Sequence, residues 1–398
     1  MTQKSEDRLL FLLAFAFFAH IMDFIIMLPL GDELMRKLSI SPSQFSFLIS
    51  IYSILAGIMG FISAMFMDKY DRKHVLMVTL VGFTIGTYWC GFAQTYHTLL
   101  VARAFTGAFG GVTGGIIMSI VSDIIPFSRK GRAMGIISGA FSVASIIGVP
   151  FGLFLSTKFG DWHVPFIFFG IVSTISTIVS FYLIPNVNGH IVVGKGFKSP
   201  KTLLGNVIKD KNQSNALIWT FLLILGHFII IPFLSPSLIR NSGFNPDRIP
   251  LIYFIGGIFT IFASYYSGKL SDRYGSKKVY LVTVLCSFVP IILLTHVGKI
   301  NIIESFFVTS LFFIFASARM IPANTLVTSS VNASTMGSFM ALRSCVIELG
   351  EGLAAFIGGQ IIVENPNGTF SNYTYLGYIS VFLSLLTLIF AYKAKVAK

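Results

Sequence analysis

Long runs of apolar residues alternate with short polar segments along the whole chain. Twelve of these runs reach about 20 residues, the length that an α-helix needs to cross the hydrocarbon core of a membrane. Each run therefore predicts one membrane-spanning helix, and the predicted fold is all-α with twelve transmembrane helices. The predicted spans are residues 9–30, 43–67, 75–93, 97–120, 133–157, 164–184, 216–239, 249–267, 279–297, 302–326, 337–363 and 373–392.

The composition favours a membrane protein over a soluble one. Hydrophobic residues make up 54% of the chain and charged residues 11%, whereas a typical soluble domain has roughly 25% charged residues. The three cysteines, Cys90, Cys286 and Cys345, lie in apolar runs, which argues against a disulfide framework or a zinc cluster. The sequence has no phosphate-binding loop and no nucleophile constellation. We therefore expect neither an enzyme nor a primary pump, and no metal or cofactor.

Lysine and arginine residues predict which way the spans face. With the amino terminus inside the cell, the cytoplasmic segments hold 20 of the 29 Lys and Arg residues and the outer segments hold six. Because Lys and Arg are retained on the cytoplasmic side, both termini are predicted to be cytoplasmic. The net charge of +13 then reports orientation in the membrane, and we expect no nucleic-acid partner.

One long polar connection, rich in Lys, Gly and Asn, divides the spans into six plus six. We expect an N-terminal six-helix bundle over 1–185, a cytoplasmic linker over 186–214 and a C-terminal six-helix bundle over 215–398. An offset of 204 residues places Asp23-Phe24-Ile25-Ile26 on His227-Phe228-Ile229-Ile230, and the charged loop 68–73 on 272–277. This repeat predicts two bundles related by a pseudo-two-fold axis along the membrane normal.

Three local motifs resemble those of the major facilitator superfamily. The loop 268–278 is similar to the superfamily's signature loop, although the first-half copy has Ala64 and Asp71 where glycines are usual. Residues 103–107 resemble its Arg-x-x-x-Gly pattern. Gly139 and the sequence Gly148-Val149-Pro150-Phe151-Gly152 resemble the antiporter signature of twelve-helix drug:proton exporters, in the variant of sugar-efflux-like members. The resemblance implies export of the cargo.

The signature loops predict a gate at the cytoplasmic ends of the spans. Asp68 and Asp272 can pair with neighbouring cations, such as Arg72 and Arg273, and stabilise a nearby helix amino terminus. A contact of this kind can form in one state and break in the other. The alternative is a solvated loop whose charges only reflect topology.

Glycines in the fifth span predict a hinge. Gly135 and Gly139, like Gly148 and Gly152, are four residues apart, so each pair lies on one helix face and permits close backbone approach. Pro150 removes a helix hydrogen bond and can bend the span. The alternative is ordinary tight packing at the same place.

Ionisable residues inside the spans carry the functional prediction, because charges in a membrane are costly and are usually paired and functional. At 1.5 Å per residue, Asp23 and Arg103 both lie about 21 Å from the cytoplasmic side. We therefore expect the two to pair and the carboxyl to bind and release a proton during transport. His20, one turn before Asp23, is either a proton relay or a packing residue.

The second half offers a rival proton site. Glu348 and Glu351 are three residues apart on one helix face, at about the depth of His227. Two adjacent carboxyls disfavour joint ionisation. Arg319 and Arg343 lie nearer the cytoplasmic ends of their spans, where they either reach toward the interface, pair with Glu348 or bind cargo.

The function predicted from these features is proton-coupled export of small amphipathic or drug-like molecules by alternating access. The alternatives are proton symport of a nutrient, efflux of a sugar, peptide or siderophore, and a membrane sensor that transports nothing. The expected partners are a small-molecule cargo, protons and the lipid bilayer. We expect a monomeric multi-pass protein of a bacterial inner membrane.

Overall fold

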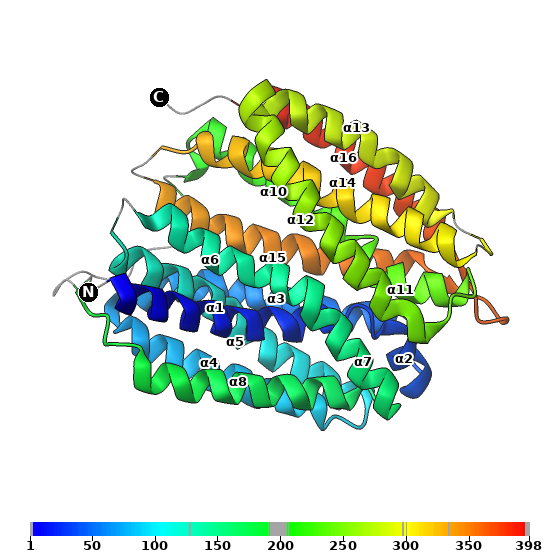
Figure 1. Ribbon diagram of the computed structural model, residues 1–398, viewed down its shortest axis with the longest axis horizontal. Coiled ribbons are helices and arrows are strands. Elements are labelled where there is room, and N and C mark those ends of the chain that lie inside the picture. Colours follow the sequence, from blue (N-terminus) through cyan, green and yellow to red (C-terminus); the bar gives the residue numbers. More distant parts are fainter. Residues whose placement is uncertain are drawn as a thin grey trace.

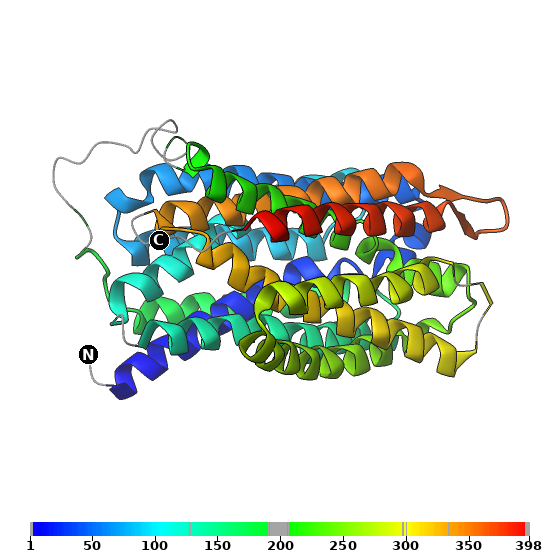
Figure 2. The same cartoon turned by 90° about the horizontal axis from the view of Figure 1, so that it is seen from above.

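The computed structural model describes residues 3–126, 129–189, 191, 205, 207–296, 298–299, 301–332 and 335–394. Most of the 186–214 linker lies outside the described residues, so the boundaries of the two halves stay a prediction. Helix α1 begins and α16 ends at the same end of the molecule (Figure 1, Figure 2). This end is called the terminal side below, and the opposite end the distal side.

The long helices run between the terminal and distal sides. The first half consists of α1 (Gln3–Ile26), α2 (Gly31–Lys37), α3 (Pro42–Phe66), α4 (Arg72–Gly91), α5 (Tyr96–Ile124), α6 (Lys130–Val143), α7 (Val149–Phe159) and α8 (His163–Leu183). The second half consists of α10 (Lys211–Phe228), α11 (Ile231–Arg240), α12 (Ile249–Tyr274), α13 (Ser276–Thr295), α14 (Ile302–Ser329), α15 (Met336–Ile361) and α16 (Tyr373–Lys393). A short antiparallel hairpin, β1 (Val363–Glu364) with β2 (Phe370–Ser371), lies on the distal side.

The predicted twelve-helix membrane fold is confirmed. Among the described residues, eleven helices or joined helix pairs are long and apolar enough to cross a membrane. The remaining predicted span, the eleventh along the chain, is α15, a helix of 26 residues. Arg343, Glu348 and Glu351 lie in its interior rather than at its ends.

Local sequence signals fix the distal starts of several spans. Ser, Thr and Asn side chains accept hydrogen bonds from the free amides of the first turn, and the residue three positions later bonds back to the cap. The residue pairs that do this are Ser41 with Gln44 in α3, Thr95 with Thr98 in α5, and Asn301 with Glu304 in α14.

Two spans that were predicted as single helices are interrupted, and the first span ends early. Helix α1 ends at Ile26, before a break that leads to α2 at Gly31, and the seventh span breaks between α10 and α11. Proline explains both breaks, because Pro29 and Pro232 cannot donate a backbone hydrogen bond. The fifth span contains a π-helical turn, Ala144–Gly148, between α6 and α7. The first two breaks lie at positions that the 204-residue offset brings together.

The two halves repeat one packing scheme. In the first half α1 contacts α6 and α8, α5 contacts α3 and α4, and α4 contacts α8. In the second half α10 contacts α15 and α16, α14 contacts α12 and α13, and α13 contacts α16. If the six spans of each half are numbered in chain order, each contact in the first half joins the same pair of span numbers as a contact in the second half. The fold therefore has the internal symmetry that the sequence offset predicts.

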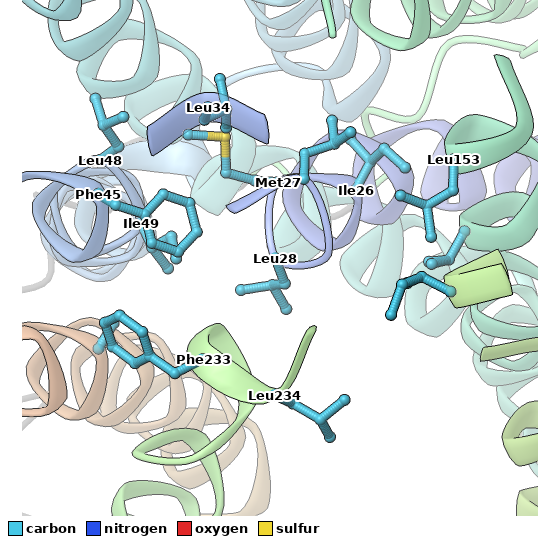
Figure 3. Close-up of a cluster of buried hydrophobic side chains, with 14 of the residues drawn as sticks. Ile26, Met27, Leu28, Leu34, Phe45, Leu48, Ile49, Leu153, Phe233 and Leu234 are labelled. Atoms are coloured by element: carbon cyan, nitrogen blue, oxygen red, sulfur yellow. The ribbon is translucent and has the colours of Figure 1, made fainter. Parts of the chain in front are cut away.

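The halves share one hydrophobic core on the distal side, whereas toward the terminal side they meet through α3 and α15, where Phe61 packs against the second-half core. α3 and α15 lie side by side (Figure 1, Figure 2), α7 packs on α12, and α2 on α11. One distal hydrophobic core contains residues of both halves, and Phe45 and Phe233 face each other across it, to the left of Leu28 (Figure 3). On the terminal side each half has a separate core. The space between the halves therefore closes toward the distal side.

Candidate functional site

A buried ion pair joins α1 to α5 in the interior of the first half. Arg103 Nη1 donates to Asp23 Oδ2 at 2.8 Å, and both side chains are 0% exposed. The same nitrogen lies 3.3 Å from the Asp23 carbonyl oxygen. The sequence-predicted contact is thus present. Together the two charges are neutral, which reduces the cost of placing them within the membrane.

Close helix packing positions Arg103 on an aromatic ring. One turn along α5, Gly107 lies directly on the backbone of Tyr52, where a Cβ atom would collide. This approach places the Arg103 guanidinium 4.2 Å from the centroid of the Tyr52 ring, a favourable cation–π contact. The Tyr52 hydroxyl in turn hydrogen-bonds to His20 Nδ1 at 3.4 Å. A chain of side-chain contacts therefore runs from His20 to Tyr52, from Tyr52 to Arg103 and from Arg103 to Asp23.

The ion pair does not use all of its hydrogen-bonding capacity. Within the described part of the chain, Asp23 Oδ1 and Arg103 Nε and Nη2 are buried without a hydrogen-bond partner. A buried polar atom without a partner costs about 1–3 kcal/mol. The two side chains therefore form one strong contact with each other and leave part of their hydrogen-bonding capacity unused.

The second half repeats the arginine but replaces the carboxylate. His227 of α10 stands at the position equivalent to Asp23, and Arg319 Nη2 of α14 donates to its Nδ1 at 3.3 Å. Arg319 Nη1 donates to Ser384 Oγ at 3.0 Å and lies 3.5 Å from Ser287 Oγ. Among the described residues, no carboxylate forms an ion pair with Arg319.

Arg319 lies nearer the terminal end of its span, as predicted, but the alternative in which it reaches toward the interface is wrong. Its side chain is 1% exposed, and it lies ten residues, about 15 Å, before the end of α14 at Ser329. The helix extends beyond the predicted span end at 326, so the depth was underestimated. Arg319 is an interior residue that neutral groups surround.

Glu348 and Glu351 face the space between the halves. Both are partly exposed although they lie midway along α15. At 100° per residue they lie on the side of the helix opposite the exposed apolar residues Leu353, Phe356 and Ile357. Neither carboxylate forms an ion pair with any described residue. Both are therefore available to cargo, water or protons.

Arg343 does not pair with Glu348, which corrects one of the alternatives drawn from the sequence. Its guanidinium instead bonds to Asn324 of α14 through Nη2, and its Nε lies 3.4 Å from Thr220 Oγ1 of α10. Arg343 and Glu348 are five positions apart, so they lie on different faces of α15. Arg343 connects α15 to the rest of the second half.

Tyr52 links the ion pair to the carboxylates of α15. Gly57, five residues after Tyr52 on α3, packs against Glu348. Tyr52 itself lies against the Arg103 guanidinium. Rings continue the connection between the halves, because Phe24 stacks on Tyr52 with centroids 5.3 Å apart and lies 6.4 Å from Phe228 of α10.

The predicted gate residues are brought together in the first half. Arg72 Nη2 donates to Asp68 Oδ1 at 2.8 Å, and Arg72 Nε donates to Asp123 Oδ2 at 3.0 Å. The Arg72 side chain is buried, so these bonds tie the ends of α3, α4 and α5. Asp123, at the end of α5, was not predicted, since 51 residues separate it from Arg72.

The second-half gate residues are not brought together. Asp272 and Arg273 are both exposed, and Arg273 lies over the ring of Tyr274, 5.2 Å from its centroid. Neither forms an ion pair within the described ranges. The two signature loops therefore have different structures in this conformation.

The predicted hinge glycines divide into a packed group and an open group. Gly148 packs against Met22, and Gly152 packs against Ile26, with Pro150 between them. At Gly135 and Gly139, a Cβ atom would meet no neighbouring atom within 4 Å, so the prediction of close approach is wrong for this pair.

The open glycines lie on the face of the fifth span that packs on α12 farther along. Ile146, on this face, contacts Gly257 of α12. The halves are therefore in contact at Ile146 and separate toward Gly139 and Gly135. This separation explains why the sequence-based packing argument fails at those two positions.

A second ion cluster, which the sequence did not reveal, joins the halves on the distal side. Asp32 of α2 pairs with Arg36 at 2.9 Å and with Arg240 of α11 at 2.6 Å. Arg240 also pairs with Glu364 of β1 at 2.5 Å and stacks on the ring of Phe370. These four charged residues are called the distal ion cluster. Because 208 residues separate Asp32 from Arg240, no local pattern marks the contact.

A different carboxylate lies outside the spans, in the turn between α7 and α8. Burial alone would raise the pKa of Asp161, but hydrogen bonds from the backbone and ring nitrogens of His163 outweigh burial, and the net pKa is lowered. Among the described residues no three His, Cys, Asp or Glu side chains gather into a metal-binding group.

Comparisons with known proteins agree with the fold. The model of the Major Facilitator Superfamily matches residues 12–225 and 216–397. The MFS-type transporter YbcL of Bacillus subtilis is 22% identical over 89% of this chain and 88% of its own length. A probable sugar efflux transporter of Helicobacter acinonychis is 22% identical over 91% and 95%.

Two solved structures have the same fold at low sequence identity. The nucleoside transporter NupG (D323A mutant) has a TM-score of 0.75 at 15% identity and covers 97% of this chain and 98% of its own. A bacterial homologue of the human lysosomal transporter Spinster, in an inward-facing and occupied conformation, has a TM-score of 0.73 at 15% identity, over 99% and 97%.

Proposed function

Because this chain belongs to the major facilitator superfamily and is a multi-pass membrane transporter, we propose that it exports small amphipathic or drug-like molecules in exchange for protons. The observation that carries the proposal is the Asp23–Arg103 pair, fully buried in the interior of the first half. A carboxylate at this place is costly unless it gains either a cation or a proton. It can therefore couple ion movement to conformation.

The proposed orientation places the terminal side in the cytoplasm of a bacterial cell, since most Lys and Arg residues lie there. In that orientation the structure faces inward, with the distal core closed and the terminal cores apart. Cargo then enters from the cytoplasm and reaches the partly exposed Glu348 and Glu351. The protein works as a monomer, because one chain supplies both halves.

In the proposed cycle a proton from the outside binds an Asp23 oxygen and weakens the contact with Arg103. The guanidinium then retains the Tyr52 ring and the Asp23 carbonyl oxygen as partners. The weakened ion pair is transmitted through Tyr52 to Phe24, which stacks on its ring. It is also transmitted along α3 to Gly57, which packs against Glu348. Release of the proton to the cytoplasm restores the ion pair.

Two gates and one hinge serve this cycle. The terminal gate is formed by Asp68 and Arg72 in the first half, with Asp272 and Arg273 free to engage when the terminal side closes. The distal gate is the distal ion cluster. The packed segment from Gly148 to Gly152 is the pivot, because the halves touch next to it and separate beyond it.

Glu348, Glu351 and His227 form the alternative proton site. The two carboxylates face the space between the halves without a cation partner among the described residues, so they are accessible to protons from the terminal side. His227 is bonded to Arg319 instead. If this site carries the proton, neutralising Asp23 will leave coupling intact.

Sugar efflux is the second candidate function. A relative of similar length is named a probable sugar efflux transporter. The rings of Phe24 and Phe228 meet between the halves and offer an apolar platform, and the partly exposed Glu348 and Glu351 offer hydrogen-bond acceptors; both suit a sugar ring as well as a drug-like amine.

The test uses protein reconstituted in vesicles with an imposed pH gradient, and reads cargo flux and lumenal pH together over a panel of drug-like cations and sugars. An exporter moves cargo and protons in opposite directions, and a symporter moves them in the same direction. Binding without flux would indicate a sensor.

Asp23→Asn is expected to abolish pH-driven accumulation and to leave cargo binding measurable. Removing one partner of a buried pair costs about 3–5 kcal/mol, so Asp23→Asn/Arg103→Gln, which removes both charges, is the second variant. Asp161→Asn, in an exposed turn, is the control for loss of a carboxylate. Unchanged pH-driven transport in both variants would move the proton site to Glu348 or Glu351.

A further inference from the structure

A basic groove opens on the terminal side of the second half, between the starts of α10 and α13 and the end of α16. Its volume is about 750 Å³, and the residues that line it are Lys211, Asn212, Asn215, Lys277, Tyr392 and Lys393. α16 packs against both α10 and α13 (Figure 1), so three helix ends enclose the groove. Nothing in the transport cycle uses it.

The groove is built by specific contacts. Lys277 Nζ donates to the Tyr392 carbonyl oxygen at 3.2 Å, which joins the start of α13 to the last turn of α16. α13 begins after Gly275 without a side-chain cap, so its first amides remain available to an anion. By contrast, Asp210 caps the start of α10.

Among the described residues, no carboxylate forms an ion pair with the lysines of the groove. In the first half, terminal-side arginines have carboxylate partners, such as Arg129 with Glu6 and Arg132 with Asp7, both at 3.0 Å. In the groove, the described residues include three lysines and no acidic side chain. An anion would therefore gain a favourable interaction without displacing an internal partner.

The groove lies at the level of the lipid headgroups. Three membrane spans end there, at Lys211, Ser276 and Lys393. Tyr392 is 86% exposed, and exposed tyrosines are typical of the membrane–water interface. One helical turn toward the membrane interior, Leu281 follows Lys277 on α13 and Ile389 precedes Lys393 on α16, and both apolar side chains are exposed.

We propose that this groove binds the phosphate group of an anionic phospholipid in the terminal leaflet. Lys211 and Lys393 supply ammonium groups, and the first amides of α13 supply directional hydrogen-bond donors. The acyl chains follow the apolar surface of α13 and α16. That surface favours a lipid over free phosphate, which would use the charges alone.

The test measures lipid binding to the purified full chain in detergent by native mass spectrometry. The probes are phosphatidylglycerol, phosphatidylcholine and inorganic phosphate. Lys211→Gln/Lys393→Gln removes two groove charges. Lys209→Gln/Lys278→Gln is the matched control, because it removes two neighbouring exposed charges that do not line the groove.

The wild type and the control pair are expected to bind phosphatidylglycerol with similar affinity. The groove pair is expected to bind it about 30-fold more weakly, at about fivefold per lysine. Equal losses in both variants would show diffuse attraction to the basic surface and overturn the proposal. Unchanged binding in the groove pair, equal binding of phosphatidylcholine, or full competition by inorganic phosphate at the same concentration would also overturn it.

Discussion

The distal ion cluster is expected to set the balance between the inward-facing and outward-facing states. Only the Asp32–Arg240 contact, at 2.6 Å, crosses between the halves within this cluster. Asp32 keeps Arg36, on the same helix, and Arg240 keeps Glu364, in the same half, whichever state the protein adopts. Opening the distal side therefore breaks one contact and leaves two neutral pairs.

Two substitutions in this cluster should shift the equilibrium in opposite directions. Asp32→Asn removes the crossing contact and favours distal opening. A charge-assisted hydrogen bond contributes about 1.5–3 kcal/mol, and because both residues keep a second partner the lower figure applies, which is a shift of about tenfold. Glu364→Gln removes the partner that Arg240 retains after opening, so it favours the closed state, by a smaller factor.

The assay is a distance measurement between spin labels at Lys37→Cys and Asp247→Cys, two exposed distal positions outside the cluster, in a background without native cysteines. Asp32→Asn should increase the population with the longer distance, and Glu364→Gln should decrease it. Arg36→Gln is the control, because that side chain is 60% exposed and should change the ratio less than about twofold. A shift in the same direction for Asp32→Asn and Glu364→Gln would refute the reasoning.

Two further predictions concern stability. Gly107→Ala places a methyl group on the Tyr52 backbone and should lower the free energy of unfolding by about 1–3 kcal/mol. Gly135→Ala meets open space and should be neutral or stabilise the protein by up to about 1 kcal/mol. Thermal unfolding in detergent compares the two variants, and equal losses of stability would contradict the packing described. Asp161→Asn should lower the free energy of unfolding at neutral pH by less than about 1 kcal/mol, because the side chain is about half exposed, and so lower Tm slightly. Since the pKa of Asp161 is lowered in the folded state, its contribution is present at neutral pH and is lost as the pH falls through that lowered pKa; a difference in Tm that persists in acid would refute the assignment to His163.

The fold and the first-half ion pair were predictable from sequence because both depend on regular geometry. Span count follows from apolar length, and the contact of Asp23 with Arg103 follows from equal depth at a fixed rise per residue. The depth argument failed for Arg319 because it depends on the helix end, and α14 extends past the predicted boundary to Ser329.

Other features depend on tertiary contacts that have no local signal. The partners Asp32 and Arg240 are 208 residues apart. In the sequence both look like ordinary charged residues of the segments between spans. The open surroundings of Gly135 and Gly139 depend on the conformation of the halves. Glycine spacing shows only where close packing is permitted. Which pair is packed depends on the state of the transporter.

In the proposed proton-coupled cycle, the exchange of a carboxylate for an imidazole between the repeated halves bears on the number of protons moved per cargo. Asp23 neutralises the charge of Arg103. Arg319, in contrast, is hydrogen-bonded to His227 and to two serines, none of which carries a negative charge. A single substitution, His227→Asp, would give the duplicated site the same chemistry as the original. A transporter with two such sites would carry two protons in each turnover, and its accumulation ratio would depend on the square of the proton gradient.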